Sequence, residues 1–479
     1  MLFYTLEFVF LFAALVALLA LVRASTPRKL LLLAASAVYY AWWNPLYVLL
    51  LVFTFVLHWG IGLLLGSGGG QARRRLLLGA ALAGSLGLLA LFKYGRFLEE
   101  NARAVAVWLG FDPAWRPISL ALPIGISFFT FQAIGYTVDV YRGRLQACRS
   151  PLDFALFVSF FPQIVCGPIS RGSQLLPQIA SPRRVRLDRE AFFLVLRGLV
   201  KKVVVADNVA VLANGIFNEP AIWTSVTVWL GALAYYVQIY CDFSGYTDMA
   251  IGIARMLGYE LPENFRRPYF AGNPSEFWRR WHITLSFWFR DYVFFPLGGP
   301  YGRTLRWVRN VMLTFLATGL WHGAGWNFLL WGALHGLGLV VFRLWEEKRG
   351  DLGVTKRIRK KRVYKLVAWA LMQGWVLITW IPFRVADASD MLRALKKLIV
   401  FDFDFRLANI GLGSVSLFST ILILAGFFAL HLWSYFRGDL DRRLAEAPAA
   451  LAVIASAVAG LLLFLFWPLS EAPFIYFQF

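Results

Sequence analysis

Long apolar runs separated by short basic stretches make up most of this chain. Several of the runs reach the roughly 20 residues that a helix needs to cross the hydrocarbon core of a bilayer. The predicted spans are residues 3–22, 30–43, 46–66, 76–92, 118–140, 222–241, 308–321, 326–345, 364–381, 413–434 and 449–468. The pattern therefore predicts an all-α polytopic membrane protein with ten or eleven transmembrane helices, folded as a single domain over residues 1–479.

Three stretches depart from this pattern. Residues 96–109 are shorter and more polar, which favours a helix lying at the membrane interface. Residues 152–170 and 190–216 are apolar but are interrupted by proline, glycine or basic residues. Such broken segments survive in a membrane when they are buried in protein or line a cavity, so re-entrant or tilted helices are expected there. Hydropathy leaves the number of crossings between residues 150 and 310 open.

Charge and composition set the orientation and the class of partner. Of the 479 residues, 59% are hydrophobic, and the mean hydropathy of +0.61 is far above that of soluble domains. Lysine and arginine exceed aspartate and glutamate by 48 − 27 = 21. Their clusters after the first and third spans and at residues 346–363 should be cytoplasmic, so the N-terminus should face outward. Nucleic acid is excluded as a partner, because the basic residues are spread between apolar spans rather than gathered on one face.

Residues 261–336 carry the densest candidate chemistry. Three of the five histidines lie there, at His282, His322 and His335. An ionisable side chain in an apolar segment is costly and therefore indicates function, and histidine is the usual base near neutral pH. The alternative for His322 is a packing role in which its ring bonds a carbonyl. His282 fits either substrate orientation and proton transfer or a bond to backbone, and His335 fits a structural role best.

Other reactive residues carry weaker signals. The three cysteines, Cys148, Cys166 and Cys241, have no metal-ligand or redox spacing and are expected to be small buried residues. Asp242 and Asp248 are six residues apart and do not form a metal pattern, so a cavity-lining or structural role is expected. No metal site is predicted, and the absence of a GxSxG motif gives no support to a serine acyl-enzyme.

Seven runs of the sequence form an extended set of motifs. They are PENFRRPYF, FWRRWHITLSFWFRDYVFFPLGG, GLWHGAGWNFLLWGALHG, SFFTFQAIGYTVDVYRG (127–143), FPQIVCGPISR (161–171), YCDFSGYTDMAIGIARMLG (240–258) and the tail FIYFQF (474–479). Together they resemble the membrane-bound O-acyltransferase family, and most closely its bacterial polysaccharide branch. The first hundred residues and the region from about 340 to 470 match that branch mainly in hydropathy.

The resemblance implies a fold, a reaction and site residues. The fold would be a helical ring around a funnel-like centre, with His322 as the general base and His282 at the family's second polar position. The reaction would move an acetyl group from cytosolic acetyl-CoA across the bacterial inner membrane to O-acetylate an exopolysaccharide such as alginate. The acceptor would be the polysaccharide itself or a periplasmic SGNH-type acetyltransferase partner. Acetyl-CoA would be a substrate, with no permanently bound cofactor.

The basic, aromatic segment before His322 has two interpretations. Its candidate residues are Arg266, Arg267, Arg279, Arg280, Arg290, Trp278 and Trp281. Arginines bind phosphates bidentately and aromatic faces can stack a base, which suits the pyrophosphate and adenine of coenzyme A. The other interpretation is an amphipathic segment that lies on anionic lipid with aromatic anchors. The residues favour neither, and one segment can do both.

Two rival functions stay open at the level of sequence. Within the family, the chain could transfer D-alanine to teichoic acid or acetylate peptidoglycan or cellulose. From a different class, it could be a transporter or lipid scramblase in which broken helices line a path and His322 relays protons.

Overall fold

The computed structural model describes residues 1–112, 120–181, 183–405, 414–468 and 474–475. All regular elements in these residues are helices, which confirms the all-α class. Within the described residues, five segments are long and apolar enough to cross a membrane: Pro45–Gly66, Gln71–Trp108, Trp326–Lys348, Arg362–Arg384 and Ser416–Arg437. The polytopic character is thus confirmed, while the count of ten or eleven spans stays a prediction. Parts of the predicted spans 118–140 and 413–434, and the tail beyond residue 475, lie outside the described residues.

The chain divides into two compact units. One contains Met1–Phe192 and Met249–Pro262, and the other contains Phe193–Asp248 and Glu263–Phe479. The backbone passes from one unit to the other within helices α10 (Arg189–Leu199) and α12 (Ser225–Met256), and again after Pro262. The prediction of a single domain over the whole chain stays a prediction.

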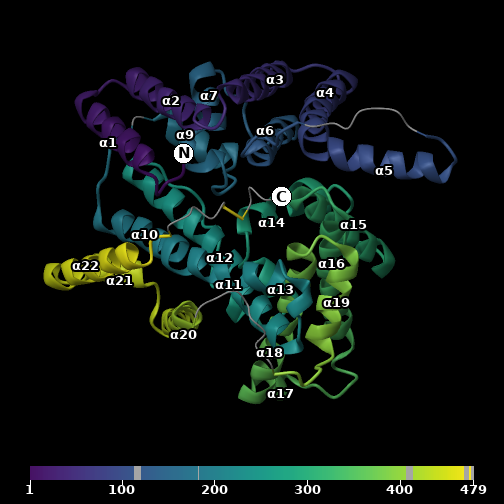
Figure 1. Cartoon of the computed structure of the whole chain (residues 1–479). Helices are drawn as coiled ribbons and strands as arrows, with labels where there is room; N and C mark the ends of the chain where they lie inside the picture. The colour runs from purple at the N-terminus through teal and green to yellow at the C-terminus, as the bar shows by residue number, and fades with distance from the viewer. Residues whose placement is uncertain (113–119, 182, 406–413, 469–473, 476–479) are drawn as a thin grey trace. The chain divides into compact units, whose positions relative to one another are not determined.

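The first unit is built from nine complete helices in the part of the chain that is described. They are α1 (Leu6–Leu21), α2 (Ser25–Ala41), α3 (Val48–Gly66), α4 (Gln71–Leu89), α5 (Gly95–Trp108), α6 (Ile126–Tyr141), α7 (Pro151–Ser159), α8 (Phe161–Ile164) and α9 (Gly172–Ala180). Helices α3, α4 and α6 pack side by side (Figure 1). The fully buried His58 on α3 bonds Thr137 on α6 and Ser85 on α4, each at 2.7 Å, and so ties the three helices together.

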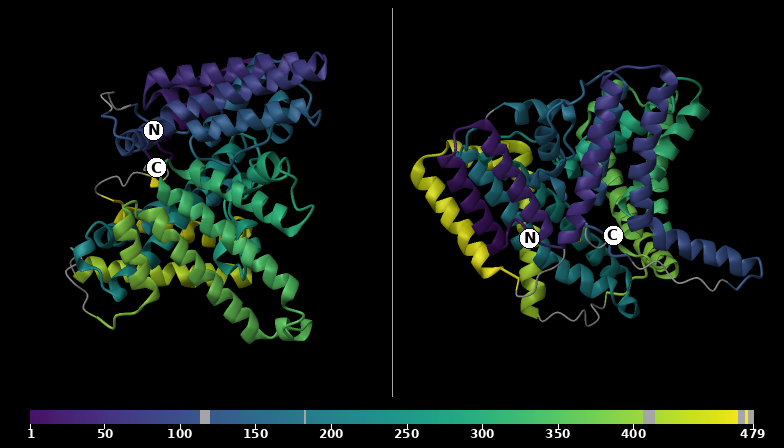
Figure 2. Two further views of the ribbon diagram at one scale, coloured as in Figure 1. Left: turned by 90° about the vertical axis from the view of Figure 1, so that its right-hand side faces the viewer. Right: turned by 90° about the horizontal axis from the view of Figure 1, so that it is seen from above.

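Irregular helical geometry marks the stretches that depart from the apolar pattern. Residues 96–109 form most of α5, which continues from α4 through a π-helical segment at Ala90–Tyr94 and then takes a different direction (Figure 2). Residues 152–170 form the short helices α7 and α8, and residues 190–216 form α10, a second π-helical segment at Val200–Ala206, and α11 (Asp207–Phe217). The broken helices predicted there are confirmed, and their course through the membrane stays a prediction.

Besides α11 and most of α12, the second unit holds the helices that follow in the chain. They are α13 (Pro274–Trp278), α14 (Ile283–Phe289), α15 (Thr304–His322), α16 (Trp326–Lys348), α17 (Lys356–Lys360), α18 (Arg362–Arg384), α19 (Ala388–Ile399), α20 (Ser414–Arg437), α21 (Leu440–Glu446) and α22 (Ala449–Leu465). Helices α15 and α16 form a hairpin joined by three residues, and α16 also packs on α13 and α18 (Figure 1).

Glycines allow the α15–α16 hairpin to pack backbone against backbone. A Cβ atom at Gly319 would overlap the carbonyl oxygen of Phe328, and one at Gly332 would overlap that of Phe315. Close approach of this kind is the usual role of small residues spaced along membrane helices. The space beside Gly323 is likewise filled by the Phe328 ring, so this glycine also serves close packing of the hairpin.

Candidate active site

His322 lies at the end of α15, where the hairpin turns. It is the last residue of the helix, its side chain is buried, and Gly323–Gly325 lead directly into α16. Its ring contacts Trp331 of α16 at 4.8 Å and Phe383 of α18 at 5.2 Å between ring centroids. Three helices thus hold the imidazole in aromatic surroundings.

His282 has an unusual backbone conformation. Its φ of 42° is left-handed, a conformation that non-glycine residues seldom adopt and that marks a constrained position. The backbone around it is held by Asn264, whose carbonyl accepts from the Ile283 N–H at 2.9 Å. The Asn264 side chain also accepts from the Thr284 hydroxyl at 2.9 Å. This pairing places the imidazole inside the unit, where it is fully buried.

The fold brings His282 and His322 together although forty positions separate them in sequence. Their ring centroids are 6.4 Å apart, and the Trp321 ring lies 5.7 Å from His282 and 5.0 Å from His322. Burial lowers the pKa of His282 to about 3, so this ring is neutral at pH 7. A buried pair of histidines, one of them neutral, can accept a proton from a hydroxyl and orient it.

The ring of Trp331 lies between His335 and His322 and contacts both. His335 is four residues after Trp331 on α16, and its ring centroid is 4.7 Å from that indole. The same indole therefore contacts both His322 and His335. Sequence alone favoured a structural role for His335, and its link to His322 depends on Trp331, which the sequence did not single out. A signal for this contact was present in the sequence. Glycines four residues apart, at 319 and 323 and again at 332 and 336, predict close packing of the two helices that carry them.

The candidate tryptophans are buried in the same aromatic cluster. Trp281 stacks on Phe277 at 5.6 Å and lies 5.1 Å from Trp380, while Trp278 lies 5.8 Å from Trp331. Their indole faces are therefore covered by protein rather than presented to solvent. Whether they contact coenzyme A stays a prediction.

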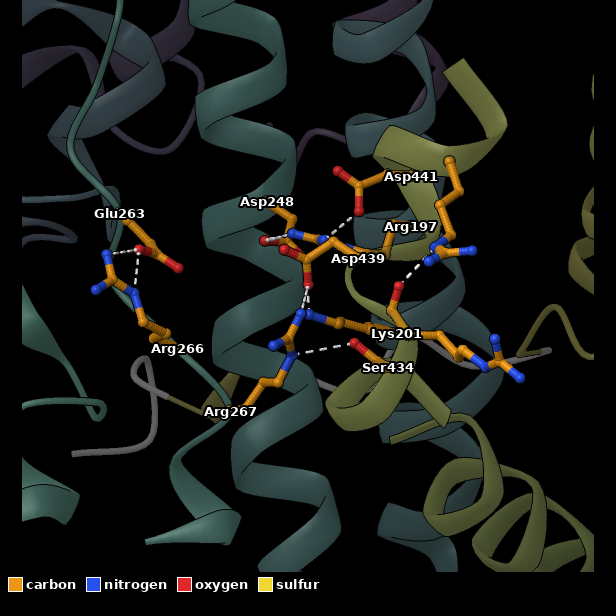
Figure 3. Close-up of polar contacts among 11 residues, drawn as sticks. Arg197, Lys201, Asp248, Glu263, Arg266, Arg267, Ser434, Asp439 and Asp441 are labelled. Carbon is orange, nitrogen blue, oxygen red and sulfur yellow. Dashed lines mark hydrogen bonds and ion pairs between the residues drawn. The ribbon is translucent and has the colours of Figure 1, made fainter. Parts of the chain in front are cut away.

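The candidate arginines all have acidic or hydroxyl partners. Arg266 pairs with Glu263 at 2.5 Å, and both side chains are exposed. Arg267 donates to Ser434 at 3.1 Å and to Asp439 at 2.6 Å, which ties the segment to the end of α20 (Figure 3). Arg280 pairs with Glu276 at 2.6 Å.

The other two arginines of this set point toward solvent. The exposed Arg279 donates to the Ser275 hydroxyl at 2.7 Å, and the exposed Arg290 pairs with Asp291 at 2.7 Å. Arg266, Arg279 and Arg290 are therefore the members of the set that a charged ligand can reach most easily. A phosphate would compete there with exposed ion pairs, which contribute only about 0–1 kcal/mol.

The two buried aspartates of α12, Asp242 and Asp248, form ion pairs with basic side chains. Asp242 pairs with Lys202 at 2.9 Å and accepts from the Ile475 backbone N–H at 2.8 Å. Asp248 binds Arg197 at 2.8 Å and Lys201 at 2.7 Å. Both carboxylates thus hold helices together, the kind of role expected from sequence. In the described ranges no group of three or more histidine, cysteine, aspartate or glutamate side chains could hold a metal ion.

Comparison with known proteins identifies the family. The profile of the membrane-bound O-acyltransferase family matches residues 147–373, which include His282 and His322. The chain is 36% identical to the probable alginate O-acetylase of Azotobacter vinelandii, covering 98% of this chain and 99% of that protein. It is 40% identical to the corresponding Pseudomonas aeruginosa protein, covering 82% of this chain and 74% of that one.

A third relative has a different named substrate. The peptidoglycan O-acetyltransferase of Helicobacter pylori is 36% identical, covering 78% of this chain and 73% of that protein. The names of these relatives all describe acyl transfer, which favours the enzyme over the rival interpretation as a transporter or scramblase. The chain is therefore a multipass membrane acyltransferase that belongs to the membrane-bound O-acyltransferase family.

Proposed function

We propose that the protein is an O-acetyltransferase of the bacterial inner membrane. It takes the acetyl group of cytosolic acetyl-CoA and delivers it to a hydroxyl group on the periplasmic side. The final acceptor is an exopolysaccharide such as alginate, reached directly or through a periplasmic SGNH-type acetyltransferase partner. The near full-length similarity to probable alginate O-acetylases supports this acceptor class.

The buried His282–His322 pair is the observation that carries the proposal. His322 takes the proton of the acceptor hydroxyl as its oxygen attacks the thioester carbonyl carbon. The new C–O bond forms, the C–S bond breaks, and the thiolate of coenzyme A leaves and takes up that proton. His282, which burial keeps neutral, orients the acceptor or the imidazole of His322. Exclusion of water by the surrounding rings protects the thioester from hydrolysis.

In this proposal the basic segment binds the acyl donor, acetyl-CoA. Arg266, Arg279 and Arg290 are exposed, and with Arg267 and Arg280 they would bind the phosphates of coenzyme A. Trp278 and Trp281 lie deeper, beside the histidines, so we assign them to the acyl and pantetheine end of the donor rather than to the adenine. Because coenzyme A is cytosolic, we assign residues 262–309, which contain this segment, to the cytoplasmic side of the membrane.

We assign a buried polar stripe on α12 to the acceptor. Tyr235, Gln238 and Asp242 recur at helical spacing on one face of α12, and all three are buried. Arg384 ends α18 directly after Phe383, which contacts His322, and it donates to Asn218 at 2.7 Å. A hydroxyl-bearing acceptor would find hydrogen-bonding partners along this stripe.

Acetyl transfer by the purified protein tests the proposal. With labelled acetyl-CoA and polymannuronate, with and without a periplasmic SGNH-type acetyltransferase, wild type should produce an alkali-labile ester, and His322→Ala should lose more than about 100-fold of that activity. His58→Asn is the matched control, because it removes an equally buried histidine whose bonds are structural; its activity per folded molecule should be unchanged. Muropeptide and a D-alanyl thioester, offered in parallel, test the rival acceptor and donor. Full activity of folded His322→Ala would exclude His322 as the base.

A further inference from the structure

Three aromatic N–H groups gather beside the histidine pair. They belong to Trp278 of α13 and to Trp331 and His335 of α16, whose exposed fractions are 9%, 0% and 1%. The ring centroids are mutually close: 5.8 Å between the two indoles, and 5.0 and 4.7 Å from His335 to Trp278 and Trp331. The three rings therefore form one compact cluster, which we call the donor cluster.

No hydrogen-bond partner serves these groups within the described parts of the chain. The indole nitrogens of Trp278 and Trp331 and both ring nitrogens of His335 are buried and have no acceptor or donor there. Buried N–H groups are nearly always paired, because an unpaired donor loses its hydration without compensation. Three such groups in contact therefore indicate a site for an acceptor that comes from a ligand.

The donor cluster adjoins the base. The Trp331 ring lies 4.8 Å from the ring of His322 and 4.7 Å from that of His335. Its position is fixed because Gly332, the next residue, packs against the backbone of α15 without room for a Cβ atom. The donors are thus preorganised on a rigid hairpin rather than on a mobile loop, as electrostatic stabilisation requires.

We propose that the donor cluster binds the carbonyl oxygen of the acyl thioester and stabilises the oxyanion that forms during transfer. This inference rests on the proposed acyl transfer and names a binding site for the thioester group of acetyl-CoA. When the acceptor oxygen attacks, the carbonyl π electrons move to the oxygen, which gains negative charge. The oxygen then accepts hydrogen bonds from the indole N–H of Trp331, assisted by Trp278 and His335. Collapse of the adduct returns those electrons to the carbonyl and expels the thiolate.

The chemistry of the cluster favours a carbonyl over a phosphate. Its members are indole and imidazole groups that pack against one another. A phosphate is charged before the reaction and binds best to guanidinium groups. A thioester oxygen is neutral when it binds and charged only in the transition state, so neutral preorganised donors assist the reaction selectively.

Phe substitutions test the donors without removing the rings. Trp331→Phe, Trp278→Phe and His335→Phe each keep an aromatic side chain and delete the N–H groups. Trp331→Phe should lower kcat by about 100-fold with little change in KM, the usual effect of losing one oxyanion donor. Trp278→Phe and His335→Phe should lower kcat by smaller factors. Trp223→Phe is the control, because its indole donates to the Ile216 carbonyl at 2.8 Å and should affect only thermal stability.

A binding measurement separates this inference from the proposed function. A non-reactive ketone analogue of acetyl-CoA keeps the carbonyl, whereas free coenzyme A lacks it. Trp331→Phe should weaken binding of the ketone analogue several-fold and leave coenzyme A binding unchanged. If wild type transfers acetyl groups but Trp331→Phe keeps its kcat within about twofold, or binds both probes as wild type does, the donor cluster is not the oxyanion site. If wild type transfers no acyl group, the proposed function itself fails.

Discussion

At the scale of single residues, His282 combines a constrained backbone with a buried, neutral ring. Its left-handed φ of 42° is tolerated by asparagine better than by other side chains. His282→Asn should therefore fold, while acetyl transfer falls at least about 10-fold because the imidazole is lost. Retention of full activity would limit His282 to a structural role.

The same substitution gives a pH-dependent signature. Burial lowers the pKa of His282 from 6.5 to about 3, so between these values the unfolded chain binds a proton that the folded chain does not. Stability contributed by this residue is therefore present above pH 6.5 and is lost as the pH falls toward 3. Between pH 7 and pH 5, the melting temperature of wild type should fall more steeply than that of His282→Asn. Parallel curves would show that His282 is not buried as a neutral ring.

The sequence predicted the histidines but not their neighbours. His322 and His282 stood out because ionisable residues are rare in apolar, aromatic surroundings. Trp331 and Phe383 did not, because tryptophan and phenylalanine are common in such segments and only the packing of α15, α16 and α18 selects these two. The arginines were visible as a cluster, but their individual partners, such as Asp439 for Arg267, come from distant helices.

At the scale of helices, the glycine-lined hairpin fixes the position of His322 on α15 relative to Trp331 and His335 on α16. Gly332→Ala would place a Cβ atom against the Phe315 carbonyl, so the helices must separate. We expect a loss of about 1–3 kcal/mol in unfolding free energy and reduced activity. Gly374→Ala, in a helix interior with open space around it, is the control and should be neutral or slightly stabilising. Equal melting temperatures for both variants would contradict the close packing.

A partly buried ionic cluster connects α10, α12 and α21. Asp248 binds Arg197 and Lys201, and Arg197 also binds Asp441 at 2.5 Å (Figure 3). Asp248→Asn would remove the negative charge that compensates two partly buried cations and should destabilise the protein by about 1–3 kcal/mol. Glu263→Gln is the matched control, because it breaks an exposed pair with Arg266 and should change stability by less than about 1 kcal/mol. Chemical denaturation of both variants decides whether the cluster matters.

At the scale of the whole molecule, hydropathy predicted the class of protein better than its path through the membrane. The all-α polytopic fold follows from long apolar runs, because a lipid-exposed backbone must satisfy its own hydrogen bonds. The crossings between residues 150 and 310 could not be counted from sequence, since π-helical segments and short helices such as α7 and α8 break the regular span length. Acyl transfer across the membrane is the claim that unites the site with this architecture.

Transfer between two compartments tests that claim most directly. Wild type and His322→Ala are reconstituted in proteoliposomes with the 262–309 segment outward. Acetyl-CoA is supplied outside, and polymannuronate is enclosed with or without a periplasmic SGNH-type acetyltransferase. The account predicts acetylated polymannuronate inside wild-type vesicles and none in His322→Ala vesicles. Acetylation only when acetyl-CoA and the acceptor share one compartment would contradict it.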